Sequence, residues 1–193
     1  MAYYPIFLQV KGRPCLIIGG GQVGFKKAAA LLACQARVTV VGPKGSAGLK
    51  RLVRQGKVRW KKRDFRPADL VGIELAVAAT DDPTLQRLAA REAGRRGVWI
   101  NVVDQPELCS FILPSVVRRG KLVLAISTGG ASPALAKWIR GDLQGRYGSE
   151  FGRLVQAMGR VRGKIKRRVP GVAQRKRLFE KALKAYFQVI QNG

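Results

Sequence analysis

Three glycines near the start of the chain have a spacing that suits dinucleotide chemistry. Gly19-x-Gly21-x-x-Gly24 follows the apolar run Cys15–Ile18 and precedes an amphipathic segment, which is the order strand, tight turn, helix. In such a unit the first glycine makes the turn, the second lets the backbone approach a pyrophosphate, and the third lets helix and strand pack closely. The pattern predicts a nicotinamide or flavin nucleotide. The predicted contact residues are Gly19, Gly21, Gln22, Val23 and Gly24.

The chain contains no histidine, so any acid–base chemistry has to come from other side chains. Asp104 follows the apolar residues 99–103, at the place where an open α/β sheet presents its ligand crevice. From the local sequence alone, the favoured interpretation of Asp104 is a turn-capping residue before Gln105–Glu107.

Polar residues also follow two other predicted strands. Thr80 and Asp81 come after the fourth strand and are expected to edge the nicotinamide, although a helix N-cap before Pro83 explains this stretch equally well. Pro43 and Lys44 follow the second strand, where the adenine ribose lies in a dinucleotide site. An NAD site commonly has an acidic residue there. Lys44 could instead accept the 2′-phosphate of NADP, so the sequence does not decide between the two cofactors. The alternative is that Lys44 is an ordinary solvated lysine without a role in binding.

A doubly wound, Rossmann-like α/β sheet is needed to position these residues. The predicted strands are 15–18, 37–41, 58–62, 75–79 and 98–103, and the predicted helices between them are 22–33, 47–55 and 83–96. Parallel strands joined by right-handed crossovers are the topology that this alternation favours. A nucleotide would then lie across the carboxyl ends of the strands.

The pattern changes after residue 112. Two apolar runs, 112–117 and 122–127, are joined by Arg118–Lys121 and predict a β-hairpin. Such a hairpin has little to bury against alone, which favours a dimerisation segment. Ser132 and Pro133 are predicted to begin a helix. The predicted domains are a nucleotide-binding domain at 1–112, a dimerisation segment at 113–148 and a basic, all-helical domain at 149–193.

The composition of the chain limits the classes of protein to which it can belong. The chain has 193 residues, 47% of them hydrophobic, and a formal net charge of +26. No apolar run approaches the ~20 residues of a membrane span, and three cysteines without metal-ligand spacing favour a reduced, cytoplasmic protein. Residues 151–193 hold 12 lysine and arginine residues against one acid, Glu180. Nucleic-acid binding, a polyanionic substrate and a merely basic, solvated surface all explain this excess.

Six local patterns, in this order, resemble the siroheme synthase N-terminal module, the precorrin-2 dehydrogenase / sirohydrochlorin ferrochelatase family. They are Tyr4–Phe7, Gly19–Gly24, Ala79–Asp82, Asn101–Asp104, Ser110–Pro114 and Ser127–Pro133. The resemblance implies NAD-dependent oxidation of precorrin-2 to sirohydrochlorin, and it leaves insertion of ferrous iron open as a second activity. The chain is expected to be the stand-alone form, because it ends where fused relatives continue into a methyltransferase.

The resemblance also implies roles for single residues. The aspartate that matches Asp104 is the proposed acid–base residue of the family, and it would also serve during chelation, for which no fixed metal ligands are expected. Gln86 stands where the family often has asparagine, and we interpret it as a minor change on a helix face. The implied partners are a polycarboxylate tetrapyrrole and a second copy of the chain. The residues expected to line the tetrapyrrole cleft are Ser110, Phe111, Ser127, Thr128 and Gly129.

A second class of function is kept as the alternative: a non-catalytic module that senses NAD(H) and binds nucleic acid through its basic tail. We do not expect nucleic acid to be the primary partner. The tail has few aromatic residues, and its apolar residues recur at helical spacing, which predicts a buried stripe. These are Leu154, Met158, Val161 and Ile165. Cys109 is interpreted as a small packing residue, because nothing in the sequence activates it.

Overall fold

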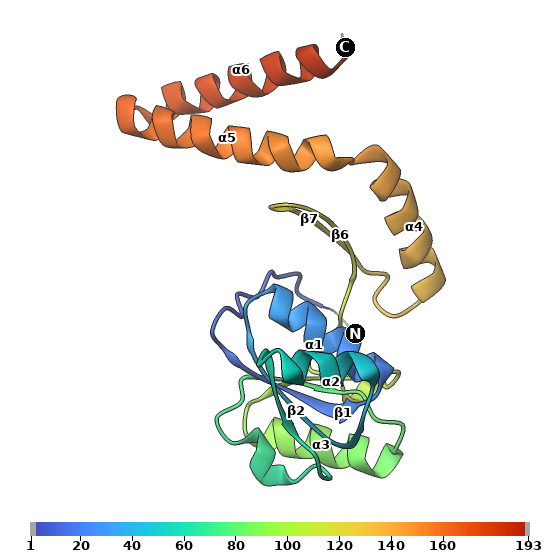
Figure 1. The fold of residues 1–193 in the computed structure, drawn as a ribbon. Helices are drawn as coiled ribbons and strands as arrows, with labels where there is room; N and C mark the ends of the chain where they lie inside the picture. The colour runs from blue at the N-terminus through green and yellow to red at the C-terminus, as the bar shows by residue number, and fades with distance from the viewer. Residues whose placement is uncertain (1–2, 192–193) are drawn as a thin grey trace. The chain divides into compact units, whose positions relative to one another are not determined.

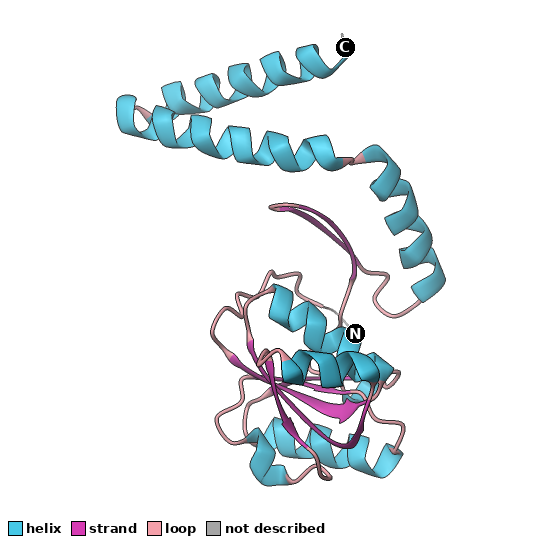
Figure 2. Cartoon of the chain, viewed as in Figure 1, coloured by secondary structure: helices cyan, strands magenta, loops and turns pink. Residues whose placement is uncertain are grey.

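The computed structural model describes the backbone of residues 3–191 and the side chains as far as Phe187. The chain forms two compact units, which divide between Leu113 and Pro114. Figure 1 follows the chain from end to end, and Figure 2 shows where helices and strands alternate.

The first unit is built on a five-stranded sheet with the order β3-β2-β1-β4-β5. Every neighbouring pair of strands is parallel, so the predicted doubly wound sheet is confirmed. The strands are β1 Pro14–Gly20, β2 Arg37–Gly45, β3 Val58–Lys61, β4 Leu75–Ala78 and β5 Trp99–Val102. Successive connections run in opposite directions from β1. The topological switch point, where ligands bind in such sheets, therefore lies between β1 and β4.

Helices cover both faces of this sheet (Figure 1). Helices α1 (Gln22–Ala33) and α2 (Ala47–Arg54) lie on one face, and α3 (Pro83–Arg95) lies on the other. Alternate residues of β1 serve the two sides, because Cys15 and Ile17 belong to one apolar cluster and Leu16 and Ile18 to the other. Burial of both faces explains why the central strand is continuously apolar in the sequence. Short 3₁₀ helices, η1 (Pro67–Leu70) and η2 (Pro106–Leu108), complete the unit.

Strand β2 is longer than the sequence predicted. It was expected to end at Val41 but continues through Pro43 and Lys44 to Gly45, which pairs with Gly20 of β1. A tertiary contact supports the extension: the Trp60 indole N–H donates to the Gly42 carbonyl at 3.0 Å. The end of β2 is thereby held beside the glycine turn.

The second unit contains the predicted hairpin, formed by antiparallel strands β6 (Ser115–Arg119) and β7 (Leu122–Ile126). Strand β6 begins three residues later than the predicted start at Ile112, because the preceding segment bonds to β5 of the first unit's sheet instead. Three helices follow: α4 Pro133–Arg146, α5 Ser149–Arg168 and α6 Val172–Gln191.

Ser132 caps α4 as predicted, accepting a hydrogen bond from the Leu135 N–H at 3.1 Å. The apolar stripe of α5 is confirmed in part: Leu154 is buried, whereas Met158, Val161 and Ile165 are half-buried. Over residues 3–191, no helix has both the length and the apolar composition needed to cross a membrane.

Candidate functional site

The glycine turn after β1 is formed by close backbone contacts. Gly19 has a φ of +106°, and a Cβ there would lie 2.2 Å from the Ala79 carbonyl oxygen, in the loop after β4. A Cβ on Gly24 would lie 2.0 Å from the Gly19 carbonyl oxygen. The first glycine therefore makes a turn that only glycine tolerates, and the third brings α1 against the end of β1, as the motif predicts.

The middle glycine differs from the other two. A Cβ on Gly21 would meet no atom within 4 Å, so its surroundings are open. Gly21 is also the N-cap of α1, where no side chain supplies a capping hydrogen bond and the first turn has no acidic residue. Gln22 and Val23 are exposed, and their backbone N–H groups have no partner within the helix, so these groups remain available to an anion. This cradle fits the pyrophosphate of a dinucleotide.

Helical spacing places Val23 on one face with Ala28, Leu31 and Leu32, which predicts that Val23 is buried. This prediction is wrong: Val23 is 45% exposed, and the residues of α1 that face the sheet are Gly24 and Ala28. Its exposure places an apolar side chain at the mouth of the turn. Pro43 and Lys44, at the end of β2, are exposed as well. A Cβ on Gly20 would lie 2.3 Å from the Lys44 carbonyl oxygen, so the end of β2 and the glycine turn touch.

The loop after β4 lies at the switch point. Asp82 caps α3, accepting hydrogen bonds from the N–H groups of Thr84 at 2.8 Å and Leu85 at 3.2 Å, which confirms the N-cap interpretation of this stretch. Thr80 is half-buried, and Asp81 is exposed.

Gln86 is not a minor residue on a helix face, as the sequence predicts. Its side chain is buried, and its Nε2 donates to the Thr80 carbonyl at 2.7 Å. Gln86 thus fixes the loop after β4. The sequence held a signal for this role: Gln86 shares its helix face with the buried Ala89 and Ala93.

Asp104 lies beside that loop. Val102 of β5 pairs with Ala78 of β4, and the Val103 N–H donates to the Ala78 carbonyl at 2.9 Å, so the two loops leave the sheet at the same level. Asp104 is exposed and has a φ of +61°, a left-handed conformation that is uncommon for a non-glycine residue. Such strained positions cluster at active sites.

The structure supports one part of the alternative interpretation of Asp104. Asp104 lies in a turn in which the Gln105 N–H donates to the Val102 carbonyl at 3.3 Å, but its side chain does not cap η2, whose N-cap is Gln105. Across residues 3–191, the ion pairs also leave Asp81 and Asp104 without a basic partner, despite the large excess of cations. A carboxylate without such a partner is free to accept a proton from a ligand.

The segment that follows η2 binds along the free edge of β5. The Ile100 N–H donates to the Ser110 hydroxyl at 2.7 Å, and the buried Asn101 side chain donates to the Phe111 carbonyl at 3.1 Å. Cys109 packs against the apolar cluster that includes Ala89, and burial raises the pKa of its thiol, which agrees with a packing role. Ser110 and Phe111 therefore lie in the same unit as Asp104.

The other residues expected to contact a tetrapyrrole belong to the second unit. Ser127, Thr128 and Gly129 form the turn before α4, where the Gly129 N–H donates to the Ser127 hydroxyl at 3.0 Å and the Ser132 N–H donates to the Thr128 hydroxyl at 3.1 Å. Gly129 has a φ of +64° and open space around it. The predicted site residues as far as Phe111 therefore lie together in the first unit. Ser127, Thr128 and Gly129 lie in the second unit.

Three family models match consecutive parts of the chain. Residues 6–115 match a family described as "Putative NAD(P)-binding", residues 119–146 match the sirohaem biosynthesis protein central region, and residues 150–191 match the sirohaem synthase dimerisation region. The first match alone covers more than half of the chain.

Similar proteins agree with these matches. The siroheme synthase of Nitrosococcus oceani is 39% identical over 183 residues, and that of Azotobacter vinelandii is 41% identical over 180 residues. These alignments cover 95% and 93% of this chain but only 39% of each relative, so the chain spans about two fifths of their length.

Among solved structures, "SirC, precorrin-2 dehydrogenase" superposes with a TM-score of 0.80 at 26% identity, covering 99% of this chain and 100% of that one. The glycine geometry, the order of the three regions and these similarities agree. The chain therefore belongs to the family of the NAD(P)-binding N-terminal module of siroheme synthase.

Proposed function

We propose that this chain oxidises precorrin-2 to sirohydrochlorin with a nicotinamide dinucleotide. The observation that carries the proposal is that an open, uncapped glycine turn and an aspartate in a left-handed backbone conformation lie on the two sides of the loop after β4. The similarity to SirC, which is named as a precorrin-2 dehydrogenase, supports the choice of substrate.

Each site residue has a proposed role. The backbone of Gly19–Gly24 binds the pyrophosphate, Pro43 and Lys44 bind the adenosine ribose, and Thr80 and Asp81 edge the nicotinamide. Gln86 holds the Thr80 carbonyl through the 2.7 Å hydrogen bond and so acts as a positioning residue.

Asp104 is the proposed base of the reaction. The bound cofactor supplies one function, acceptance of a hydride. The substrate also loses one proton, and the products are sirohydrochlorin, the reduced cofactor and H⁺. We assign that proton to the Asp104 carboxylate, because it is exposed, has no basic partner among the described residues, and follows the strand next to β4. With no histidine in the chain, a carboxylate is a suitable acceptor.

The tetrapyrrole carries several carboxylates, so a strongly cationic protein attracts it over a distance at low salt. We propose that Ser110, Phe111, Ser127, Thr128 and Gly129 contribute to its binding. The match of residues 150–191 to a dimerisation region supports a homodimer. Insertion of ferrous iron, with iron as a substrate and Asp104 as the proton acceptor, stays a prediction, as does the cytoplasmic location.

The test is anaerobic turnover of precorrin-2 with NAD⁺ or NADP⁺, followed by the appearance of sirohydrochlorin and of the reduced cofactor in equal amounts. Addition of ferrous ion afterwards shows whether metal insertion follows. Oxidation with either cofactor supports the proposal. A purified, folded protein that oxidises precorrin-2 with neither would overturn it and would favour the sensor alternative, for which binding to DNA with a steep salt dependence is expected.

A further inference from the structure

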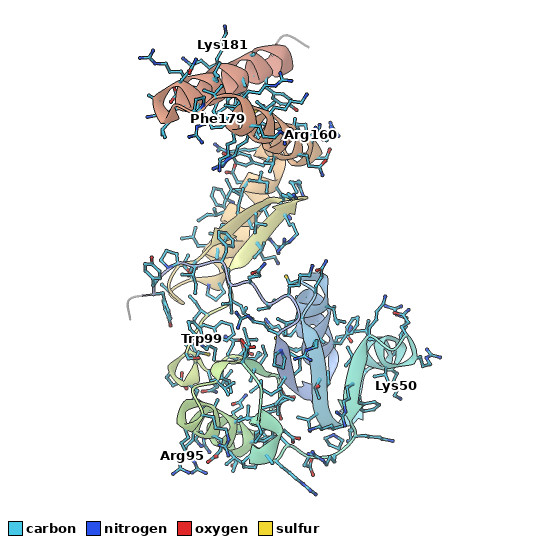
Figure 3. All side chains as sticks on the ribbon, turned by 90° about the vertical axis from the view of Figure 1, so that its left-hand side faces the viewer. Lys50, Arg95, Trp99, Arg160, Phe179 and Lys181 are labelled. Atoms are coloured by element: carbon cyan, nitrogen blue, oxygen red, sulfur yellow. The ribbon has the colours of Figure 1, made fainter. Side chains whose placement is uncertain are left out.

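Side chains, rather than a further strand, occupy the outer edge of β5. This strand is the last of the sheet, and Figure 3 shows Trp99, its first residue, on the opposite side of the first unit from Lys50 of α2. The N–H groups of Trp99 and Val103 donate on the side of β4, so the backbone groups of Ile100 and Val102 face the outer edge. Both of these residues are buried, and buried backbone groups need hydrogen-bond partners.

Two neighbouring side chains provide these partners. The Ser110 hydroxyl accepts a hydrogen bond from the Ile100 N–H at 2.7 Å and donates to the Ile100 carbonyl at 3.2 Å. The Cys109 sulfur accepts a hydrogen bond from the Val102 N–H at 3.1 Å and lies 3.3 Å from the Val102 carbonyl. The chain at 109–110 therefore runs antiparallel to β5, with side chains in the place of a sixth strand.

The Cys109 thiol also contacts the turn that carries Asp104. Its sulfur lies 3.3 Å from the Gln105 carbonyl, so the S–H group can donate to the carbonyl of either Val102 or Gln105. These two residues stand on the two sides of the turn, and they share a backbone hydrogen bond of 3.3 Å. Asp104 lies between them with a φ of +61°, a conformation that persists only where the surrounding structure fixes it.

The thiol is suited to hold this turn because it keeps its proton. Burial raises the pKa of the Cys109 thiol, so at neutral pH the group is both a donor and an acceptor. The buried Asn101 amide donates to the sulfur at 3.5 Å and to the Phe111 carbonyl at 3.1 Å, which ties the thiol to the segment that follows it. By contrast, Cys15 is buried in β1 and forms no side-chain hydrogen bond among the described residues. Packing alone therefore does not require the contacts that Cys109 makes.

We propose that Cys109 is a positioning residue for the base: its thiol hydrogen-bonds both sides of the turn after β5 and so holds Asp104 in the left-handed conformation. The inference deepens the proposed function and rests on its assignment of Asp104. A packing role needs only the volume of the side chain, whereas a positioning role needs its donor and its acceptor. Serine and alanine are similar in volume and differ in hydrogen bonding, so the two roles predict different outcomes for Cys109→Ser and Cys109→Ala.

Amide hydrogen exchange in the full chain, followed by NMR without substrate or cofactor, tests the hydrogen bonds of the thiol. The Val102 N–H reports on the thiol, and the Ile100 N–H, which Ser110 holds, is the internal reference. We expect Cys109→Ala to speed exchange of the Val102 amide by about three- to tenfold relative to that of Ile100, the range for one hydrogen bond. The Asp104 chemical shifts should move with it.

Cys109→Ser should restore most of the protection of Val102 and the wild-type shifts of Asp104. Unchanged protection of Val102 in Cys109→Ala, or equal loss of protection in the serine and alanine variants, would overturn the inference.

Steady-state oxidation of precorrin-2 tests the consequence for the base. Cys109→Ala should lower kcat by about three- to thirtyfold and leave KM and cofactor affinity within about twofold, because a displaced base slows the chemical step and not binding. Cys109→Ser should recover most of the lost rate. Cys15→Ala is the control, since it removes a fully buried thiol on β1 and should lower stability without lowering kcat. An equal fall in kcat in all three variants would overturn the inference.

The two measurements separate this inference from the proposed function. Hydrogen exchange and Asp104 shifts that depend on the thiol, in a folded chain that does not oxidise precorrin-2, would support the positioning of the turn and contradict the function. Oxidation by Cys109→Ala at the wild-type rate would support the function and contradict the inference.

Discussion

The two halves of the parallel sheet carry opposite charge. Residues 1–63, which form β1, β2 and β3, have 14 basic residues and no acidic one, whereas residues 64–113, which include β4 and β5, have five basic residues and eight acidic ones. The first half presents cations and helix N–H groups, which suit the phosphates of a dinucleotide. The second half presents carboxylates, which suit proton transfer. Under the proposed function, one sheet would thus separate anion binding from acid–base chemistry.

Within the acidic half, the carboxylates differ in whether they form ion pairs. Glu92, near the end of α3, pairs with Arg95 and Arg96, and these groups hold its pKa below the ordinary value. Asp81 and Asp104, at the carboxyl edge of the sheet, have no basic partner among the described residues. Asp64, Asp82 and Glu107 of the same half likewise have no ion pair among the described residues, although the chain has a net charge of +26.

Of these substitutions, Gly24→Ala should destabilise the protein most, and it acts in the basic half of the sheet. The added Cβ would lie 2.0 Å from the Gly19 carbonyl oxygen, so either α1 or the end of β1 has to move. We expect a loss of about 1–3 kcal/mol in the free energy of unfolding, because backbone cannot yield as a side chain does. Urea denaturation measures the loss. An unchanged midpoint would show that the helix does not approach the strand as closely as described.

Asp69→Asn should weaken the junction between the two halves. The neighbouring Arg63 guanidinium and Lys61 ammonium hold the pKa of Asp69 well below its usual range, so its ionised form stabilises the fold. We expect a loss of about 1–2 kcal/mol at neutral pH, less than for a fully buried pair because the two cations are partly exposed.

The pH dependence of that difference follows from the sign of the shift. A depressed acid pKa contributes its full stabilisation above the unfolded value of about 4, and the contribution is lost as the pH falls toward the native value. Urea denaturation of wild type and variant should therefore show a constant gap from pH 5 to pH 7 that narrows below about pH 4. A gap that widens on acidification would contradict the ion-pair account.

Gly21→Ala is the matched counterpart of Gly24→Ala. Its Cβ would meet nothing within 4 Å, and its φ of −65° suits alanine, so we expect stability to change by less than about 0.5 kcal/mol. Cofactor affinity should nevertheless fall about tenfold or more, because the methyl group occupies the space that the pyrophosphate approaches. Calorimetry measures the affinity. Undiminished binding would place the dinucleotide elsewhere.

Gln86→Leu should have the smallest effect. It removes the donor to the Thr80 carbonyl but keeps a buried side chain of similar size. We expect kcat to fall by about two- to tenfold through misplacement of the loop, with little change in cofactor affinity. Gln86→Asn tests whether a shorter amide restores the contact. If the substitution changes only the stability of the protein and not kcat, Gln86 is a packing residue and does not position the loop for the reaction.

Much of this arrangement could be predicted from the sequence, because it depends on local signals. The glycine spacing predicted the turn, and Asp82 and Ser132 indicated where two helices begin. The apolar runs predicted the buried strands. The features that were missed depend on contacts distant in the sequence. Strand β2 continues through Pro43, a residue that usually ends strands, because Gly45 pairs with Gly20.

The left-handed backbone of Asp104 and the hydrogen bond of Gln86 to the Thr80 carbonyl were missed for the same reason. The spacing of Gln86 with Ala89 and Ala93 signals its burial, but the hydrogen bond depends on the loop after β4, which no preference within the helix reports. The residues assigned to tetrapyrrole binding are divided between the two units, and their joint role stays a prediction.

The most direct test asks whether proton transfer can be removed without loss of cofactor binding. It is single turnover of precorrin-2 by the Asp104→Asn variant, saturated with cofactor. Asparagine also tolerates the left-handed conformation at this position, so the fold should be preserved. Glu107→Gln, at another exposed carboxylate three residues away, is the control. We predict cofactor affinity within about twofold of wild type and oxidation slowed by about 10²- to 10⁴-fold, the range for loss of a general base. Oxidation at the wild-type rate, or loss of cofactor affinity in parallel with rate, would contradict the account.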